Sequence, residues 1–395
     1  MDLSDSPQEA AFRAEARTFL EAHAPADPMP QYHKERVEDA VMLPRHRAWQ
    51  RTLFENGWGA LTWPKEYGGR GVGPIEQIVW NQELSRIGLG ASLFLVGTGM
   101  AGPTIIAHGT REQKERFLQP LLKAEEVWCQ LFSEPGAGSD LAGLATRAVR
   151  EGDDWIVNGQ KTWCSGAPYG DFGILLTRTD PSVPKHKGIS YFLVDMKTPG
   201  IEVRPLRQMT NDAHFSEVFL NDVRIPDSAR LGEVNAGWGC AMTTLTNERM
   251  AMAGAEGIFS YEDLVEHARK NGPVDDVTRE EIAKLYTWVK TLELLNARCV
   301  TKLGRGQIPT AESSVMKIAL ARIVSKGTEL GLHLLGPGGL LREGTWQQQW
   351  LFAPAFHLAG GTDEVQKNVA SERVLGLPTE PTEFKGTPFQ DLPRS

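Results

Sequence analysis

The sequence predicts an α+β protein built from a helical domain, a central antiparallel β domain and a second helical domain. Apolar residues recur at helical spacing in the first third of the chain, and the same spacing returns from Gly237 onward. Between these parts lie short β-branched runs divided by turns. We therefore predict domains at residues 1–126, 127–235 and 236–378, followed by a loose tail at 379–395.

The helices of the first domain carry recognisable start signals. Ser6 and Glu9 flank Pro7 in a capping-box pattern, in which two side chains satisfy main-chain N–H groups at a helix start. Thr110 and Gln113 repeat the pattern before a helix that meets a proline at residue 120. Further helices are predicted at residues 45–56 and 75–87.

The central and last domains follow different periods. Strands are predicted at residues 155–157, 174–176, 189–194 and 218–220, with a hairpin turn at 151–154. In the last domain, Thr278 and Glu281 form a third capping-box pattern, which predicts that a helix starts there. Later helices are predicted at residues 310–335 and 362–375.

Composition narrows the class of function. A formal net charge of −8 over 395 residues offers no basic surface for nucleic acid. No apolar stretch is long enough to cross a bilayer, and Met1 is not followed by a signal-peptide pattern, so we expect a cytoplasmic protein. The four cysteines form no CxxC pair, so we expect reduced thiols and no metal site.

The segment at residues 130–140 (QLFSEPGAGSD) carries the strongest functional signal. Pro135 disfavours helix, and the glycines allow a ligand to approach the main chain closely. Ser133 and Ser139 add hydroxyl groups that can donate to ring or phosphate oxygens. A turn of this kind, taken alone, is more often a structural loop than a binding site.

Together with a second segment at residues 158–165 (NGQKTWCS), this one resembles the paired FAD signature of the acyl-CoA dehydrogenase family. The resemblance implies that Trp163 lies against the isoalloxazine ring and that Ser165 hydrogen-bonds it; a core aromatic residue is the alternative for Trp163. It also implies a C-terminal four-helix bundle, a homotetramer or a mixed tetramer, and contact of Ser139 with coenzyme A. The implied contacts of the first segment with the flavin or its pyrophosphate are Gln130, Phe132, Ser133, Gly138 and Ser139.

A third segment at residues 359–366 (AGGTDEVQ) is similar to the family's EGTxxIQ loop. This similarity implies that Thr362 and Glu364 lie beside the flavin. The glutamate that opens the loop in many members is the catalytic base, but Gly360 holds its position here. By the same resemblance, Gly360 offers its main-chain N–H to the thioester carbonyl of the substrate.

Oxidation of an acyl thioester requires a carboxylate that removes the α-proton while hydride leaves the β-carbon for flavin N5. Some family members carry this base on a helix after the β domain, immediately before an arginine. Glu248 and Arg249 match that arrangement, so Glu248 is the predicted base and Arg249 a predicted coenzyme A contact. Asp363 and Glu364 are weaker candidates for the base, and a solvated or ion-paired residue is the alternative for Glu248.

Two further positions resemble family sites that reach the FAD of a neighbouring subunit. Arg269 lies where the family has the arginine of an RxFG pattern, although Lys270 and Asn271 follow it here. Gly336 opens a segment similar to the family's LGGxG turn, with Pro337 in place of a glycine.

These resemblances imply FAD-dependent α,β-dehydrogenation of an acyl-CoA in lipid metabolism or β-oxidation, with electrons passed to an electron-transfer flavoprotein. Two alternatives stay open: a flavin monooxygenase or oxidase of the same fold, and a silent partner subunit of a mixed tetramer. The acyl group is left open among long, branched and cyclic ones. The glycines between Ala91 and Met100, which correspond to a pocket wall in the family, suggest room for it.

Overall fold

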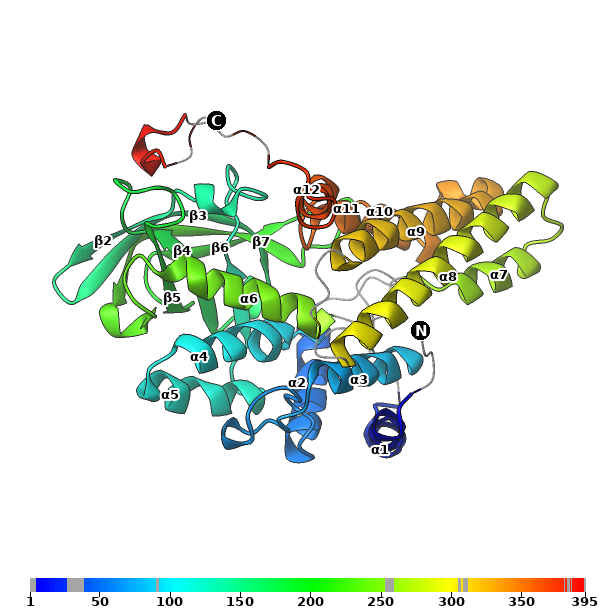
Figure 1. Ribbon diagram of the computed structural model, residues 1–395, viewed down its shortest axis with the longest axis horizontal. Coiled ribbons are helices and arrows are strands. Elements are labelled where there is room, and N and C mark those ends of the chain that lie inside the picture. Colours follow the sequence, from blue (N-terminus) through cyan, green and yellow to red (C-terminus); the bar gives the residue numbers. More distant parts are fainter. Residues whose placement is uncertain are drawn as a thin grey trace. The chain divides into compact units, whose positions relative to one another are not determined.

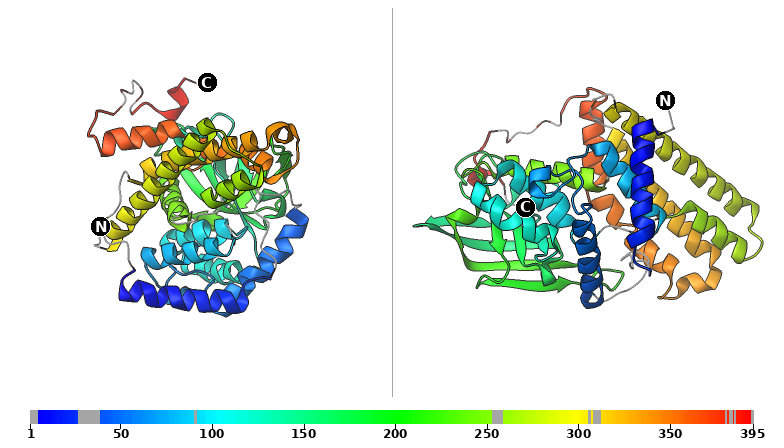
Figure 2. Two further views of the ribbon diagram at one scale, coloured as in Figure 1. Left: turned by 90° about the vertical axis from the view of Figure 1, so that its right-hand side faces the viewer. Right: turned by 90° about the horizontal axis from the view of Figure 1, so that it is seen from below.

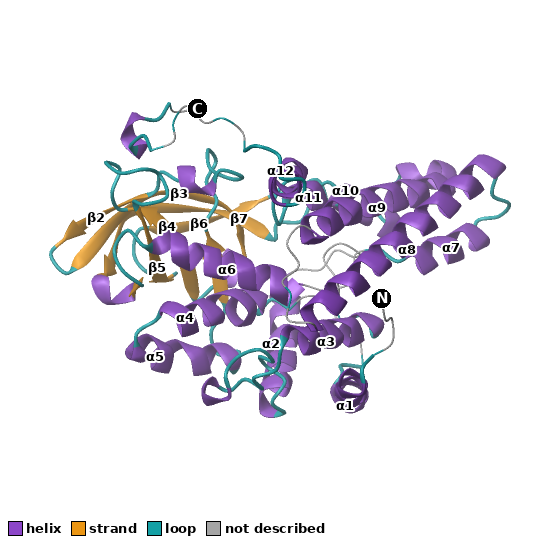
Figure 3. Ribbon diagram, viewed as in Figure 1, coloured by secondary structure: helices purple, strands orange, loops and turns teal. Residues whose placement is uncertain are grey.

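The structure is a computed structural model that describes residues 5–26, 39–89, 92–252, 259–304, 307, 312–379, 381, 384 and 386–393. The chain divides into two compact units. The sheet unit comprises Asp39–Gly73, Ala91–Ala253 and Pro381–Ser395, and the helical unit comprises Met1–Glu38, Pro74–Gly90 and Gly254–Glu380. The predicted order of helices, strands and helices holds along the chain (Figure 3).

The sheet follows the order β6-β7-β3-β2-β4-β5-β8, with β1 paired to β4. Most pairs are antiparallel, as predicted, but β1 and one residue of β2 run parallel to β4, so the sheet is mixed at that strand. Glu151 pairs with Asp154 across the predicted hairpin turn, where Gly152 takes φ +65°. The four predicted strands lie in β3, β4, β5 and β7. The strands are β1 (Trp128–Leu131), β2 (Arg147–Glu151), β3 (Asp154–Ser165), β4 (Phe172–Arg178), β5 (Ile189–Asp195), β6 (Ile201–Leu206), β7 (Phe215–Pro226) and β8 (Arg230–Leu231).

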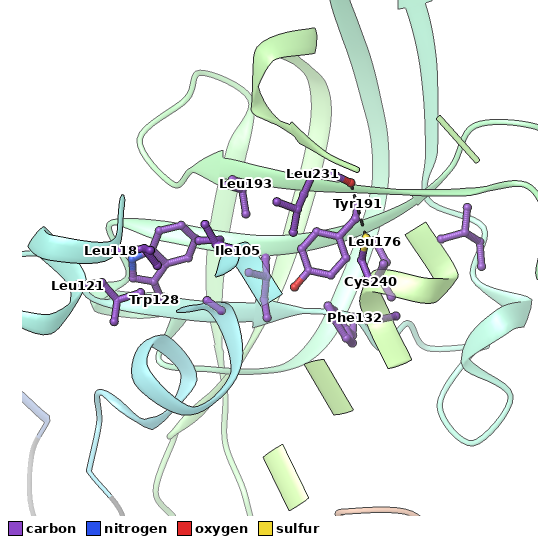
Figure 4. Close-up of a cluster of buried hydrophobic side chains, with 14 of the residues drawn as sticks. Ile105, Leu118, Leu121, Trp128, Phe132, Leu176, Tyr191, Leu193, Leu231 and Cys240 are labelled. Carbon is purple, nitrogen blue, oxygen red and sulfur yellow. Dashed lines mark hydrogen bonds between the residues drawn. The ribbon is translucent and has the colours of Figure 1, made fainter. Parts of the chain in front are cut away.

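Helices cover one part of this sheet. They are α2 (Asp39–Glu55), the π-helical turn η2 (Val96–Ala101), α4 (Gly102–His108), α5 (Arg111–Leu122) and α6 (Gly237–Met252). The predicted capping box of Thr110 and Gln113 is formed at the start of α5, which continues past the proline at residue 120. Tyr191 of β5 and Cys240 of α6 are both buried in the shared core, and Figure 4 shows the sulfur of Cys240 directed toward the carbonyl oxygen of Leu231. This core holds α6 against the sheet (Figure 1).

The helical unit is built around two long helices. In it α8 and α9 lie side by side, and α7, α10 and α12 pack against α9 (Figures 1 and 2). Its helices are α1 (Pro7–His23), α3 (Pro74–Arg86), α7 (Tyr261–Lys270), α8 (Asp276–Gly304), α9 (Glu312–Leu334), α10 (Thr345–Phe352), α11 (Ala355–Leu358) and α12 (Asp363–Arg373). None of the described helices is long and apolar enough to span a bilayer.

Two helix starts in this unit test the capping predictions. Ser6 and Glu9 form the predicted capping box at the start of α1. The predicted start at Thr278 is wrong, because Asp275 accepts a hydrogen bond from the N–H of Thr278 at 2.9 Å and α8 begins at Asp276. Asp275 and Thr278 are both good capping residues, and the earlier one caps the helix.

A buried carboxylate ties α1 to α3. Glu83 of α3 is 2% exposed and forms ion pairs with Arg13 at 3.1 Å and Arg17 at 2.8 Å from α1, and with Arg86 at 2.9 Å from its own helix. Burial acts to raise the pKa of Glu83, but the three guanidinium groups outweigh it and hold the pKa at about 2.

The C-terminal tail is not loose over the residues that the structure describes near its end. Phe389–Asp391 form a 3₁₀ turn, η7. The N–H groups of Phe389 and Gln390 donate to the carbonyl oxygens of Val183 and Pro181, both at 2.9 Å. All four cysteines are free and buried.

Candidate active site

The two glycine- and serine-containing segments of the β domain lie beside each other. After β1 ends at Leu131, the first segment turns through a short bridge in which Glu134 and Ala137 exchange main-chain hydrogen bonds. The second segment is the end of β3. The N–H of Thr162 donates to the carbonyl oxygen of Ser133 at 2.9 Å, which joins the segments directly.

The turn between Glu134 and Asp140 is open to a ligand. A Cβ added at Gly136 or at Gly138 would have no atom within 4 Å. Ser139 is exposed and Ser133 is half-buried, so the turn presents hydroxyl groups and accessible main chain. Such a surface suits a phosphate or the polar edge of a ring.

A buried ion pair holds the two segments together. The Lys161 ammonium has no exposed surface and lies 2.8 Å from the Glu134 carboxylate, and it donates to the carbonyl oxygen of Phe132 at 3.0 Å. Glu134 also accepts hydrogen bonds from the N–H groups of Ala145 at 2.6 Å and Thr146 at 2.9 Å. Burial lowers the pKa of Lys161, while Lys161 and these donors outweigh burial and lower the pKa of Glu134. Both buried side chains therefore have hydrogen-bond partners from each other and from the main chain.

Trp163 is strained and presented to solvent. Its φ is +59°, where bulky side chains are rarely found, and it lies in an irregularity of the β3–β7 pairing between Lys161 and Cys164. The indole is 55% exposed and touches Phe215 edge-on at 5.7 Å between ring centroids. Ser165, half-buried, ends the same strand. The alternative considered for Trp163, a core aromatic residue, does not occur, because the strand presents an exposed aromatic face with a hydroxyl two residues away.

Phe132 and Gln130 take less exposed places than the serines. Phe132 is 4% exposed and packs edge-on against Tyr191 at 5.8 Å between centroids, as Figure 4 shows. Its ring belongs to the core, and the flavin contact predicted for Phe132 stays a prediction. Gln130 is half-buried on β1, opposite Ile174 of β4.

The predicted base lies on the packed face of α6. Thr244 and Ala251 precede and follow Glu248 by four and three residues, so the three share one helix face. Thr244 is buried and its hydroxyl lies 2.9 Å from that of Thr104 and 3.1 Å from that of Tyr191. Ala251 approaches η2 closely at a glycine. Glu248 therefore lies on the face of α6 that packs within the sheet unit, and it is half-buried.

Its surroundings favour a proton acceptor. Burial raises the pKa of Glu248 above its ordinary value, against the opposing effect of Arg249. Among the described residues, no salt bridge includes Glu248. Arg249 is exposed and donates to the carbonyl oxygen of Leu245 in its own helix at 3.2 Å. Glu248 is thus half-buried and belongs to no salt bridge among the described residues.

The glycines near residue 97 serve close packing instead of open space. A Cβ on Gly97 would lie 3.1 Å from Leu121, and one on Gly99 would lie 2.9 Å from Ala251. The room suggested by the sequence is therefore filled by neighbouring side chains at these two positions.

In the helical unit, the loop before α12 is held from several sides. Gly360 and Gly361 take φ +65° and +90°, and a Cβ on Gly360 would have no atom within 4 Å. Gln366 donates to the carbonyl oxygen of Gly360 at 2.8 Å, and Thr362 caps α12 by accepting from the N–H of Val365. Glu364 is exposed, with Lys367 at 3.8 Å.

Asp363 takes part in a hydrogen-bond network that the sequence did not predict. Its carboxylate lies 2.7 Å from His357 Nδ1 and 3.2 Å from the Lys317 ammonium. The other ring nitrogen of His357 lies 2.9 Å from the Ser325 hydroxyl. Burial acts to raise the pKa of Asp363, but its hydrogen bonds with His357 and Lys317 outweigh burial and lower that pKa. Asp363 is therefore a poor candidate for a free base.

The positions predicted to serve a neighbouring subunit are exposed. Arg269 lies in the last turn of α7, and Gly336 begins the 3₁₀ turn η6 (Gly336–Leu340) with φ +55°. Within the described part of the chain, no contact tests whether Arg269 or Gly336 reaches a neighbouring subunit. Both roles stay predictions.

Comparison with known families decides the class of protein. Residues 6–125 match the description "Acyl-CoA dehydrogenase, N-terminal domain", residues 129–223 the middle domain and residues 235–375 the C-terminal domain. The chain belongs to the acyl-CoA dehydrogenase family. This confirms the family, the fold and the class of enzyme predicted from the sequence.

Individual acyl-CoA dehydrogenases are similar over most of the chain. FadE34 of Mycobacterium tuberculosis is 42% identical over 342 residues, which cover 87% of this chain and 48% of that protein, so the chain spans about half its length. A structure described as the Tcur3481-Tcur3483 steroid ACAD is 32% identical with a TM-score of 0.84, covering 96% and 100% of the two chains. The ChsE4-ChsE5 complex from Mycobacterium tuberculosis is 30% identical, with a TM-score of 0.80 and the same coverage.

The sheet unit fits the flavin on which this family depends. The exposed, strained Trp163 offers a flat face, and Ser133 and Ser165 offer hydroxyl groups on adjoining segments. The open turn at Gly138 suits a pyrophosphate. Lys161 belongs to the same constellation, and its signal was present in the sequence: it falls on the inward side of β3 with Trp155 and Val157, all separated by even steps.

Proposed function

We propose that the chain catalyses FAD-dependent α,β-dehydrogenation of an acyl-CoA, with Glu248 as the base. One observation supports this most directly. In the unit that also presents Trp163, Glu248 occupies the packed face of α6, with a pKa raised by burial and no salt bridge among the described residues. A raised pKa brings a carboxylate nearer to the strength needed to accept a proton near neutral pH.

The chain's own groups have separate tasks in this proposal. When bound, FAD supplies the acceptor for the hydride that leaves the substrate β-carbon. Glu248 removes the α-proton, a contribution of roughly 10²–10⁴ to the rate. Trp163, Ser133 and Ser165 hold the ring, and the turn at Ser139 holds phosphate. Gly360, which has no side chain and around which an added Cβ would meet no atom within 4 Å, offers a main-chain N–H to the thioester carbonyl.

The proposal is tested by anaerobic titration of purified protein with a panel of acyl-CoA thioesters while flavin absorbance is recorded. Glu248→Gln should bind FAD normally and lose about 10²–10⁴ of the bleaching rate. Glu364→Gln and Asp363→Asn are the controls, because they remove the two weaker candidates. Normal bleaching in Glu248→Gln, or its loss only in one of the controls, rules out Glu248 as the base.

The fate of the electrons separates the dehydrogenase from the other flavin enzymes of this fold. We propose that an electron-transfer flavoprotein accepts them. Reduced enzyme mixed with that protein should reoxidise much faster than in air-saturated buffer. Rapid reoxidation by air alone would instead place the chain with the monooxygenases and oxidases.

We further propose a cyclic, steroid-type acyl group and assembly with a second family chain. The similar structures described as a steroid ACAD and as the ChsE4-ChsE5 complex support both points.

Large apolar side chains exposed on the helical unit also support association with another chain. They include Leu340 at 90%, Leu375 at 70%, Leu341 at 67% and Leu358 at 64% exposure. Chain purified alone as a flavin-containing tetramer would favour a homotetramer, and flavin-free chain would favour the silent-partner alternative.

A further inference from the structure

The end of the chain folds onto the sheet unit at a defined place. Residues 388–392, here called the C-terminal strap, lie against the loop that follows β4 (Figure 1). The main-chain hydrogen bonds from Phe389 and Gln390 to that loop are joined by a β-bridge between Pro388 and Pro184. The strap is therefore docked through its backbone, in register, and not by side-chain contact alone.

Under the strap lies a buried guanidinium without an ion-pair partner. Arg178, the last residue of β4, is 3% exposed, and none of the salt bridges among the described residues includes it. Burial lowers the pKa of Arg178 to about 10, against the opposing charges of Glu134, Asp140 and Asp180. Within the part of the chain that the structure describes, its Nε has no hydrogen-bond partner. A buried cation in this state needs compensation from its surroundings.

Phe389 supplies that compensation. The centre of its ring lies 3.9 Å from the guanidinium carbon of Arg178. A cation over an aromatic face is attracted to the ring, and the attraction is strongest where water is excluded. The strap thus covers the open side of Arg178 while its main chain holds the neighbouring loop.

Arg178 in turn fixes the main chain around the predicted ligand turn. Its two terminal nitrogens donate to the carbonyl oxygens of Ala142 at 2.6 Å, Leu144 at 3.2 Å and Lys185. The Lys185 ammonium reaches back to the Asp140 carboxylate at 2.6 Å. Ser139 precedes Asp140, so the strap, Arg178 and the turn that presents Ser139 form one connected set of contacts.

We propose that the C-terminal strap positions the acyl-CoA binding turn, and that Phe389 is a positioning residue for the reaction. This inference rests on the proposed dehydrogenase function. Loss of the strap frees the loop at residues 180–187 and, through Arg178, the turn at residues 139–144. Because Ser139 at the start of this turn is the predicted coenzyme A contact, binding of the acyl-CoA is weakened, while Glu248 on α6 is left unchanged.

Phe389→Ala in the full chain is the main test, and Phe384→Ala is the matched control, because Phe384 is a 48% exposed phenylalanine in the same tail. With Phe389→Ala, KM for the acyl-CoA should rise about tenfold, as expected for loss of a desolvated cation–π contact, while kcat changes less than twofold. Phe389→Trp keeps an aromatic face and should restore the wild-type KM. Phe389→Leu keeps the apolar volume without that face, and should show the raised KM even if the alanine variant folds poorly.

A physical measurement accompanies the kinetics. Trypsin should cut after Lys185 and Lys187 several times faster in ligand-free Phe389→Ala than in wild type, and equally fast in Phe384→Ala and wild type. Wild-type KM and cleavage rate in both the alanine and leucine variants overturn the strap proposal, as does an equal effect of Phe384→Ala. If wild-type protein bleaches with no acyl-CoA, the proposed function itself fails, which is a separate result from an unchanged KM in a working enzyme.

Discussion

In the sheet unit, the buried carboxylate of Glu134 meets one lysine and two main-chain N–H groups, whereas Glu83 in the helical unit meets three arginines. The exposure of their cations differs as well. Lys161 has no exposed surface, while the side chains of Arg17 and Arg86 are 49% and 44% exposed. Removing Glu83 therefore leaves two of its three cations able to regain water, but removing either member of the sheet-unit pair leaves a charge buried.

The two charged clusters also connect different parts of the protein. Glu83 joins one helix to another and touches none of the residues predicted to bind ligand. Lys161 and Glu134 join the two segments that face the flavin in our proposal, and the carbonyl oxygen next to Ser133 is part of that network. We infer that the buried charges around Glu83 stabilise the fold of the helical unit. The buried pair of Lys161 and Glu134 also shapes the proposed binding surface of the sheet unit.

The largest effect should come from Lys161→Met. It leaves the Glu134 carboxylate buried without a cation, which should cost about 3–5 kcal/mol of the free energy of unfolding. The purified variant should also lose most of its FAD, because the segments carrying Ser133 and Trp163 are no longer tied together. Denaturant unfolding and the ratio of flavin to protein absorbance measure the two effects.

The double variant Lys161→Met with Glu134→Gln is the control for that prediction. Since both charges are removed, it should recover a large part of the stability lost in the single variant. If the free energy of unfolding of Lys161→Met lies within about 1 kcal/mol of wild type, the buried pair contributes no more than an exposed salt bridge. The contrast with Glu83 would then be wrong.

Glu83→Gln should have a smaller effect and a different pattern. We expect a loss of roughly 2 kcal/mol, with FAD content unchanged, because the cluster only links α1 to α3. The surface pair of Arg111 and Glu115, with side chains 86% and 63% exposed, gives the control: Glu115→Gln should cost less than about 0.5 kcal/mol.

The difference in stability between wild type and Glu83→Gln should depend on pH in a definite direction. The pKa of Glu83 is held at about 2, below its ordinary value of 4.5. Its ionisation therefore stabilises the fold fully above about pH 4.5 and loses this effect as the pH falls toward 2. The difference in thermal midpoint between wild type and Glu83→Gln should shrink on going from pH 6 to pH 3. A constant difference would mean that Glu83 acts through packing alone.

The sequence predicted what local chemistry determines. Capping boxes at Ser6 and Thr110 are satisfied within four residues, so their outcome depends little on the rest of the fold. The predicted strands were also found, because alternation and turns are local signals. Family motifs added the domain plan and the segments of the site. The helix start at Thr278 failed for a local reason too, since Asp275 competes for the same task.

The features that the sequence did not predict depend on contacts between residues far apart in the chain and on which side of a segment each residue faces. A motif marks a whole segment as ligand-binding, but neighbouring residues of an extended segment face opposite sides, so Phe132 enters the core while Ser133 stays accessible. The partners of Lys161 and His357 come from distant residues or from another helix. The docking of Phe389 on Arg178 spans more than half the chain and has no local signal.

Trp163 allows a finer test of how the sheet unit is shaped for its ligand. A φ of +59° costs a bulky residue of order 1–3 kcal/mol, while glycine adopts it freely. Trp163→Gly should therefore be about 1 kcal/mol more stable than Trp163→Ala, and both should bind FAD more weakly than wild type. Equal stability of the two variants would show that the backbone relaxes once the indole is removed, so that the ring itself holds the strain.

The smallest effect on the free energy of unfolding should come from Glu248→Gln, and its sign should be opposite to that of Glu83→Gln. Burial raises the pKa of Glu248, so above the ordinary value of 4.5 its ionised form is less favourable in the folded protein than in the unfolded chain. The neutral variant should thus be slightly more stable than wild type at pH 8, and this advantage should fade as the pH is lowered toward 5. Wild-type bleaching should fall over the same pH range, because the base must be ionised to accept a proton. A variant that is less stable than wild type at pH 8 would identify Glu248 as an ion-paired structural residue, like Glu83, and would remove the distinction between a carboxylate kept for chemistry and one kept for the fold.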